Sequence, residues 1–137
     1  MISLFCIMTW ITESSDIDKE YEINKQVFQK LDSLIRRDEL YLSADLSRED
    51  LVRMAHMNNT RFAKMIKENT GTNLSGYINE LRLNHAIHLL KEHPEYTLRA
   101  IAEASGINSM PTFHSLFKNK TGMTPSEFKK TQMDMKQ

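Results

Sequence analysis

Polar and basic side chains recur at helical spacing along one short segment of the chain, opposite a row of apolar ones. Phe113, Leu116 and Phe117 fall on a single helical face. The other side chains of this segment are candidates for contact with a ligand, and they are Met110, Thr112, His114, Ser115 and Lys118. Hydroxyl, imidazole and ammonium groups of this kind can bond to base edges in the major groove of duplex DNA. Because of its charge, Lys118 is expected to contact phosphate instead.

Two helices joined by a tight turn are predicted to present this face. Ser105 and Gly106 end the first helix, because glycine enters the left-handed region freely. Asn108 or Ser109 can cap the second helix, and Gly122 ends it. The pattern predicts a helix-turn-helix whose second helix buries aromatic side chains and exposes polar ones.

A second unit of the same kind precedes the first, at a shift of 51 positions. The matching pairs are Phe62 and Phe113, Ile66 and Phe117, Lys67 and Lys118, Thr70 and Thr121, Gly71 and Gly122, and Tyr77 and Phe128. An internal repeat of this kind indicates two copies of one supersecondary unit. The recognition candidates in the earlier copy are Asn59, Thr60, Arg61 and Lys64. Its turn differs, because Ala55 and His56 stand in place of the glycine, so the geometry of that turn is left open.

The register of the second unit resembles the C-terminal signature of the AraC/XylS family of bacterial transcription regulators. It reads I-A-x-x-x-G-[FI]-x-S-x-x-x-F-x-x-x-F-K-x-x-x-G-x-T-P-S-E-[FY]. A generic helical bundle would supply the apolar periodicity without the glycine, the F-K pair and the G-x-T-P cap in this register. The resemblance covers about residues 40–130. It implies one chain with two helix-turn-helix units that bind adjacent turns of the DNA groove.

A single long helix is predicted to link the two units, from Leu74 to His93, where Pro94 ends it. Such a helix is about 30 Å long. Recognition helices that enter successive major grooves lie about 34 Å apart. The predicted length therefore suits two recognition helices on one face of the duplex.

The first twelve residues are apolar and carry no charge. This run is shorter than the ~20 residues that span a bilayer, and no basic residue precedes it as a secretory signal would require. Three readings stay open for Met1–Thr12: a strand or helix that packs on a partner, the end of a longer upstream or membrane segment, and a disordered extension.

An amphipathic helix is predicted to follow this run, capped by Asp16 or Asp18 and ending near Arg37. Its apolar stripe consists of Tyr21, Val27, Phe28, Leu31, Leu34 and Ile35. The stripe either packs on the helices that follow or contacts a second copy of the chain. We favour intramolecular packing for this stripe, which leaves Met1–Thr12 as the preferred contact of a homodimer.

Composition favours an all-α protein of about one domain in the cytoplasm. The chain has 137 residues, 40% hydrophobic residues, 4 Gly, 3 Pro and a single Cys, so no internal disulfide is possible. The net charge is zero, but residues 1–39 hold five basic and eight acidic residues, whereas residues 40–131 hold twelve and nine. We expect an N-terminal extension over 1–39, a basic DNA-binding domain over 40–131 and a tail over 132–137.

No constellation for catalysis or metal binding stands out. His85 and His88 lie three apart on the linking helix without a third ligand, and no H-E-x-x-H or C-x-x-C motif occurs, so neither a metal nor a cofactor is expected. Cys6 lies in an apolar run, which disfavours the thiolate that a DNA-repair methyltransferase would need. The expected function is transcription regulation on double-stranded DNA, with RNA polymerase as a further candidate partner. The alternative is a protein-interaction module with vestigial DNA contact.

Overall fold

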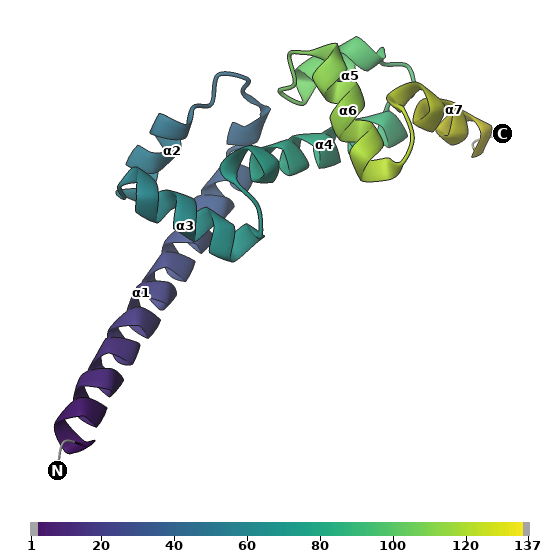
Figure 1. Ribbon diagram of the computed structural model, residues 1–137. Coiled ribbons are helices and arrows are strands. Elements are labelled where there is room, and N and C mark those ends of the chain that lie inside the picture. Colours follow the sequence, from purple (N-terminus) through teal and green to yellow (C-terminus); the bar gives the residue numbers. More distant parts are fainter. Residues whose placement is uncertain (1–2, 136–137) are drawn as a thin grey trace.

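Seven α-helices and one short 3-10 helix form the described part of the chain, which contains no β-strand (Figure 1). The computed structural model describes residues 3–135, with side chains from residue 16 onward. The elements are α1 (Ser3–Arg37), η1 (Leu40–Leu42), α2 (Arg48–Ala55), α3 (Asn59–Thr70), α4 (Leu74–Glu92), α5 (Leu98–Ala104), α6 (Met110–Thr121) and α7 (Pro125–Met135). The predicted all-α fold with two helix-turn-helix units is confirmed.

Two separate hydrophobic cores lie along α4, which is shared between them. The first core joins α1, α2, α3 and the N-terminal half of α4, and its largest fully buried side chains are Ile35, Leu51, Phe62, Met65 and Ile66. The second core joins the C-terminal half of α4 to α5 and α6, around Leu90, Ile101, Phe113 and Phe117. Helix α4 therefore contributes apolar residues to the core of each unit, as expected of the linking helix that the sequence predicts.

Side-chain caps set where the helices of both units begin. The backbone N–H groups in the first turns of α2, α3, α4, α5 and α6 donate to the side chains of Ser47, Asn58, Asn73, Thr97 and Ser109. Ser47 also forms a capping box with Asp50, and hydrogen bonds from Ser47 and Arg53 lower the pKa of the Asp50 carboxyl. Gly71 and Gly122 end α3 and α6 in the left-handed conformation. These local signals explain why the element boundaries follow the sequence pattern.

The turn of the first unit is made by a histidine. His56 has φ 54° and ψ 44°, and Gly106 has φ 82° in the turn of the second unit. One residue separates His56 from the cap Asn58, whereas two residues separate Gly106 from the cap Ser109. Equivalent positions of the two units thus differ by 50 in residue number at the left-handed residue, and by 51 from the cap of the next helix onward. His56, rather than Ala55, occupies the place of the glycine.

Replacement of His56 by glycine is expected to stabilise the protein by about 0.5 to 1 kcal/mol. The exposed His56 side chain imposes the steric cost of a Cβ in the left-handed region, and glycine removes it. Urea unfolding measures the effect as a higher midpoint with an unchanged slope. The matched control is His88→Gly on the exposed face of α4, which should destabilise by about 1 kcal/mol because it places glycine inside a helix. An unchanged or lower midpoint for His56→Gly would contradict this account.

Helix α1 begins earlier than the sequence pattern indicates. It runs without interruption from Ser3, so the predicted start at Asp16 or Asp18 is wrong. No proline or glycine lies in the segment that leads into these residues, and nothing there stops the helix. The side chains of the first fifteen residues lie outside the described part, so the readings for Met1–Thr12 stay predictions. In the part that the structure describes, no helix is both long enough and apolar enough to cross a membrane.

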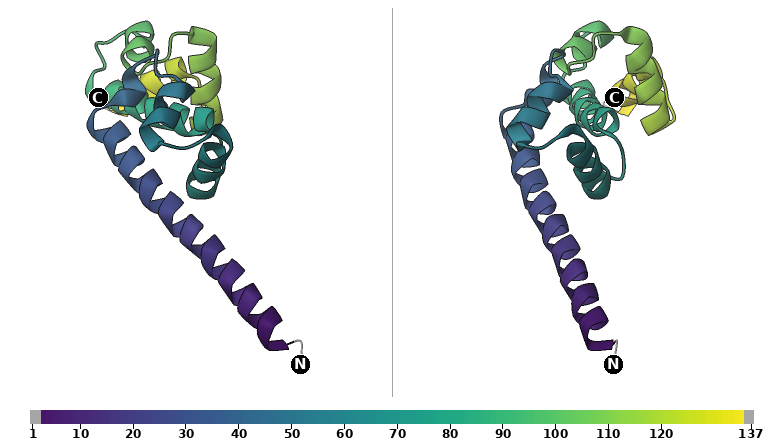
Figure 2. Two further views of the ribbon diagram at one scale, coloured as in Figure 1. Left: turned by 90° about the vertical axis from the view of Figure 1, so that its left-hand side faces the viewer. Right: turned by 60° about the vertical axis from the view of Figure 1, so that its left-hand side comes forward.

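The C-terminal half of α1 packs on the first unit, while its N-terminal end extends away from the other helices (Figures 1 and 2). Leu31 and Ile35 are buried in the first core, and the ring of Phe28 lies 5.7 Å from that of Tyr77. The Tyr77 hydroxyl donates to the carboxylate of Asp32, which also accepts from Arg36. Burial, together with this bond, raises the pKa of Tyr77. The C-terminal part of the apolar stripe of α1, which includes Phe28, Leu31 and Ile35, therefore packs on the first unit of the same chain.

Candidate nucleic-acid interface

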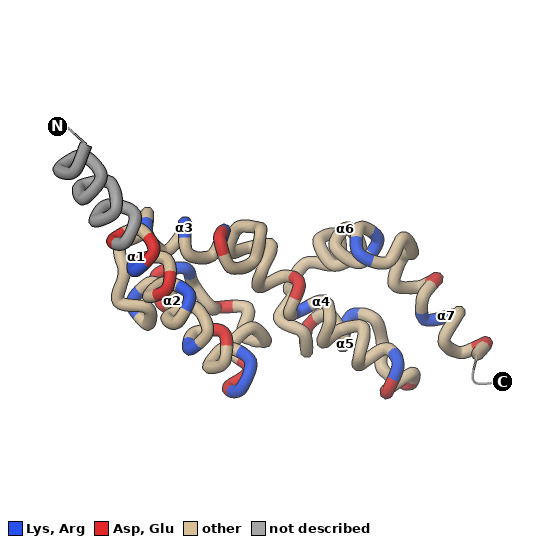
Figure 3. Tube along the Cα trace, turned by 90° about the horizontal axis from the view of Figure 1, so that it is seen from below, with Lys and Arg blue, Asp and Glu red and all other residues tan. Residues whose placement is uncertain are grey.

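Helices α3 and α6 lie along the same side of the molecule (Figure 3). Phe62, Met65 and Ile66 anchor α3 in the first core, and Phe113 and Phe117 anchor α6 in the second core, each with 0 or 1% of its surface exposed. Because the buried residues recur every three or four positions, the opposite face of each helix is left to solvent. Burial of these apolar side chains in the two cores therefore fixes the orientation of the two polar faces.

Seven of the predicted recognition residues are exposed on α3 and α6. They are Asn59, Thr60, Lys64, Thr112, His114, Ser115 and Lys118. The other two differ. Met110 is partly buried and packs against the second core, and Arg61 is partly buried, with its Nε donating to Asn24 of α1. The structure thus presents most of the predicted residues to solvent and turns Arg61 toward another helix.

Further side chains share the exposed faces but were not among the predicted recognition residues. Ala63 and Lys67 lie on the exposed face of α3, and Asn119 and Lys120 are exposed near the end of α6. Lys67 could have been found, because the repeat places it at the position of Lys118. Ala63 could have been found from helical spacing with Asn59 and Thr60, but its methyl group carries no polar signal.

Several basic side chains at this surface have partners within the protein. The Lys64 ammonium lies 4.0 Å from Glu68, Lys67 donates to the carbonyl of Gly71, and Lys120 pairs with Glu80 at 3.1 Å. Exposed pairs of this kind contribute little to stability. Lys118 makes no ion pair with any described residue, so its charge faces solvent uncompensated.

The segment between α1 and α2 connects the two units. The guanidinium of Arg82 on α4 donates through Nε to the carbonyl of Tyr41 at 2.6 Å and through Nη2 to the carbonyl of Ser43 at 2.8 Å. Burial lowers the pKa of Arg82. On the other side, the turn glycine Gly106 lies against the carbonyl groups of Tyr41 and Leu42. The 40–43 segment therefore touches both the linking helix and the turn of the second unit.

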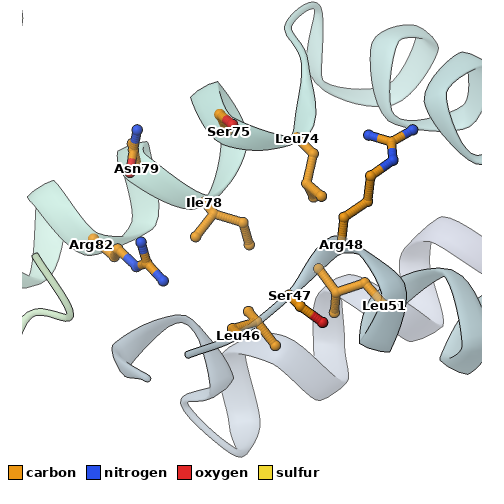
Figure 4. Close-up of a pocket in the computed structure, with 9 residues that line it drawn as sticks. All are labelled: Leu46, Ser47, Arg48, Leu51, Leu74, Ser75, Ile78, Asn79 and Arg82. Carbon is orange, nitrogen blue, oxygen red and sulfur yellow. The ribbon is translucent and has the colours of Figure 1, made fainter. Parts of the chain in front are cut away.

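A groove of about 190 Å³ lies between α2 and α4 (Figure 4). Its lining residues are Leu46, Ser47, Arg48, Leu51, Leu74, Ser75, Ile78, Asn79 and Arg82. The two arginines already have partners, since Arg48 donates to the carbonyl of Asn59 at 3.4 Å and its guanidinium stacks 5.5 Å from the ring centre of Phe62. The groove supplies packing and no set of convergent catalytic groups.

Metal ligation finds no support in the described part of the chain, where no three His, Cys, Asp or Glu side chains cluster. His85 packs with its ring 6.2 Å from that of Tyr41, and burial lowers its pKa. His88 is exposed on the same helix. The pair therefore consists of one packing residue and one solvent-facing residue.

The sequence of residues 51–131 matches the model of a family described as a helix-turn-helix domain. An uncharacterized transcriptional regulatory protein YesN from Bacillus subtilis (strain 168) is 39% identical over 80 residues, which are 58% of this chain and 22% of that protein. The RCS-specific HTH-type transcriptional activator RclR from Escherichia coli (strain K12) is 31% identical over 81 residues, which are 59% of this chain and 28% of that protein. The chain thus spans less than a third of the length of either relative.

Solved structures with the same fold include a protein of unknown function from Listeria innocua. It is 28% identical, with a TM-score of 0.66, and the match covers 76% of this chain and 95% of that one. The C-terminal domain of AraT, a response regulator from Geobacillus stearothermophilus, gives a TM-score of 0.65 at 22% identity, covering 80% of this chain and 84% of that one. At 22% identity, the likeness to this AraT domain shows the fold alone.

Proposed function

Because the chain belongs to the AraC-type helix-turn-helix family, we propose that it binds duplex DNA sequence-specifically and regulates transcription. The observation that carries this proposal is the placement of α3 and α6 on one side, each with a buried apolar face and an exposed polar face. Helix α4 separates the units and is roughly 28 Å long at about 1.5 Å per residue. A linking helix of this length suits entry of α3 and α6 into successive major-groove segments, which lie about 34 Å apart.

Within this proposal, the exposed polar side chains divide by chemistry. Amide, hydroxyl and imidazole groups at Asn59, Thr60, Thr112, His114 and Ser115 suit base edges. Ammonium groups at Lys64 and Lys118 suit base acceptors or phosphates, and the free charge of Lys118 favours phosphate. Met110 contributes apolar packing behind these groups.

The same proposal assigns the parts of the chain. Residues 40–131 form the DNA-binding domain, residues 1–39 an N-terminal extension and residues 132–137 a tail. DNA is the principal partner, and RNA polymerase and a second copy of the chain are further candidates. A regulator that only binds bacterial DNA works in the cytoplasm and needs no catalytic group of its own.

Selection of duplexes from a random pool tests the function. The expected product is a site with two short preferred segments about one helical turn apart, one for each recognition helix. Binding should weaken as salt rises from roughly 50 to 200 mM, because phosphate contacts release counterions. Recovery of no preferred sequence, with salt-independent capture, would instead indicate a protein-interaction module.

Replacement of Lys118 by glutamine is expected to weaken binding to all sequences by about the same factor, and to reduce the slope of log affinity against log salt by about one. Fluorescence anisotropy over a salt series measures both quantities. The matched control is Lys130→Gln, an exposed lysine on α7 outside the two recognition helices. A changed base preference with an unchanged slope would show that Lys118 reads a base.

A further inference from the structure

Asn24 is a polar residue at an apolar position of α1. It follows the exposed Tyr21 along the stripe and precedes Phe28 and Leu31, yet only 1% of its surface is exposed. A buried amide without a partner is unfavourable, so an amide at this position indicates a specific hydrogen bond. Its Oδ1 accepts from Nε of Arg61 at 2.9 Å, across 37 positions of sequence.

Arg61 stands in the first turn of α3 and is held at two points. Its backbone N–H donates to the capping Oδ1 of Asn58 at 2.8 Å, which fixes the backbone, and Asn24 fixes the Nε edge of the side chain. A guanidinium carries five N–H donors, four of them on its two terminal nitrogens. Among the described residues these terminal groups have no acceptor and the charge has no carboxylate partner.

The geometry points to a role for this arrangement in recognition. We propose that Asn24 is a positioning residue, which orients Arg61 so that its terminal N–H groups meet a paired acceptor on the DNA, either a guanine edge or a phosphate. The inference rests on the proposed function. Arg61 is partly exposed in the first turn of α3, the turn that also carries the exposed Asn59 and Thr60, so its terminal N–H groups belong to the end of α3 that the proposed function brings to the duplex. Because Asn24 belongs to α1, a displacement of α1 would release Arg61.

The test uses the full chain, the duplex selected from a random pool, and four variants. Asn24→Leu fits the apolar stripe but lacks the acceptor, whereas Asn24→Asp keeps an acceptor oxygen. Arg61→Met keeps the apolar stem and lacks the donors. The matched control is Gln29→Leu, which replaces an exposed amide elsewhere on α1. Affinity, salt slope, base preference and thermal midpoint are measured for each variant and for the double variant Asn24→Leu with Arg61→Met.

We expect Asn24→Leu and Arg61→Met each to weaken binding by about three- to tenfold, with no further loss in the double variant. Asn24→Asp should retain the affinity, and Gln29→Leu should be neutral. Loss of preference for a single guanine would identify a base acceptor. Uniform weakening across sequences, with a salt slope reduced by about one, would identify a phosphate.

A structural role for Asn24 predicts a different pattern. If Asn24→Leu changes the thermal midpoint while affinity, slope and base preference stay at wild-type values, the inference is overturned. Additive losses in the double variant would also overturn it. Failure of the wild-type chain to bind any duplex would overturn the proposed function and this inference together, and it is recognised before any variant is made.

Discussion

Replacement of Phe117 by alanine is expected to destabilise the second helix-turn-helix unit by about 3 to 5 kcal/mol. The Phe117 side chain is fully buried, and its ring makes edge-on contacts with Phe113 at 5.7 Å and with Phe128 of α7 at 5.3 Å. Truncation removes both aromatic contacts and leaves a cavity between α6 and α7. Because an average domain is stable by only about 5 to 15 kcal/mol, this loss removes a large share of the stability of the second unit.

Chemical denaturation with hydrogen exchange measures where the loss occurs. Amides of α5, α6 and α7 should lose protection first, whereas those of α2 and α3 belong to a separate core and should keep more of theirs. Asn119→Ala is the matched control, since it truncates an exposed side chain on the same helix. A Phe117→Ala protein with normal stability and altered base preference would show that this ring reads DNA.

Replacement of Gly106 by alanine is expected to destabilise the protein by roughly 2 to 4 kcal/mol, through two separate effects. The residue has φ 82°, which is unfavourable for any residue with a Cβ. An added Cβ would also lie 2.8 Å from the carbonyl oxygen of Leu42 and 2.9 Å from that of Tyr41. Both are backbone atoms, which cannot swing aside as a flexible side chain can.

Gly122→Ala separates these two effects. Gly122 has φ 79°, but an added Cβ there meets no atom within 4 Å, so only the backbone strain of about 1 kcal/mol applies. The difference in destabilisation between Gly106→Ala and Gly122→Ala measures the cost of the steric contact between the turn and the 40–43 segment. Gly106→Ala should also weaken binding to a two-segment duplex, because the segment held by Arg82 must shift. Equal destabilisation by both variants would show that the segment yields freely.

Short-range signals in the sequence were sufficient for the repeat and for most of the elements, but not for the start of α1. The cap Ser109, the left-handed Gly71 and Gly122, and the apolar spacing each act within a few residues, so they can be read without the fold. The same is true of α4, which was predicted from Leu74 to His93 and ends with His93 as its cap. Seven of the nine predicted recognition residues are exposed, because a helix that buries one face leaves the other to solvent.

Contacts between distant segments were decided by the tertiary structure. The sequence left open which residue of the first turn takes the left-handed conformation, and the packed structure assigns it to His56. The bond from Arg61 to Asn24 and those from Arg82 to the 40–43 segment join residues 37 to 41 positions apart. No local propensity specifies such pairs, since their formation depends on how whole helices pack. Arg61 was therefore predicted as a free recognition side chain, and only the placement of α1 shows its second partner.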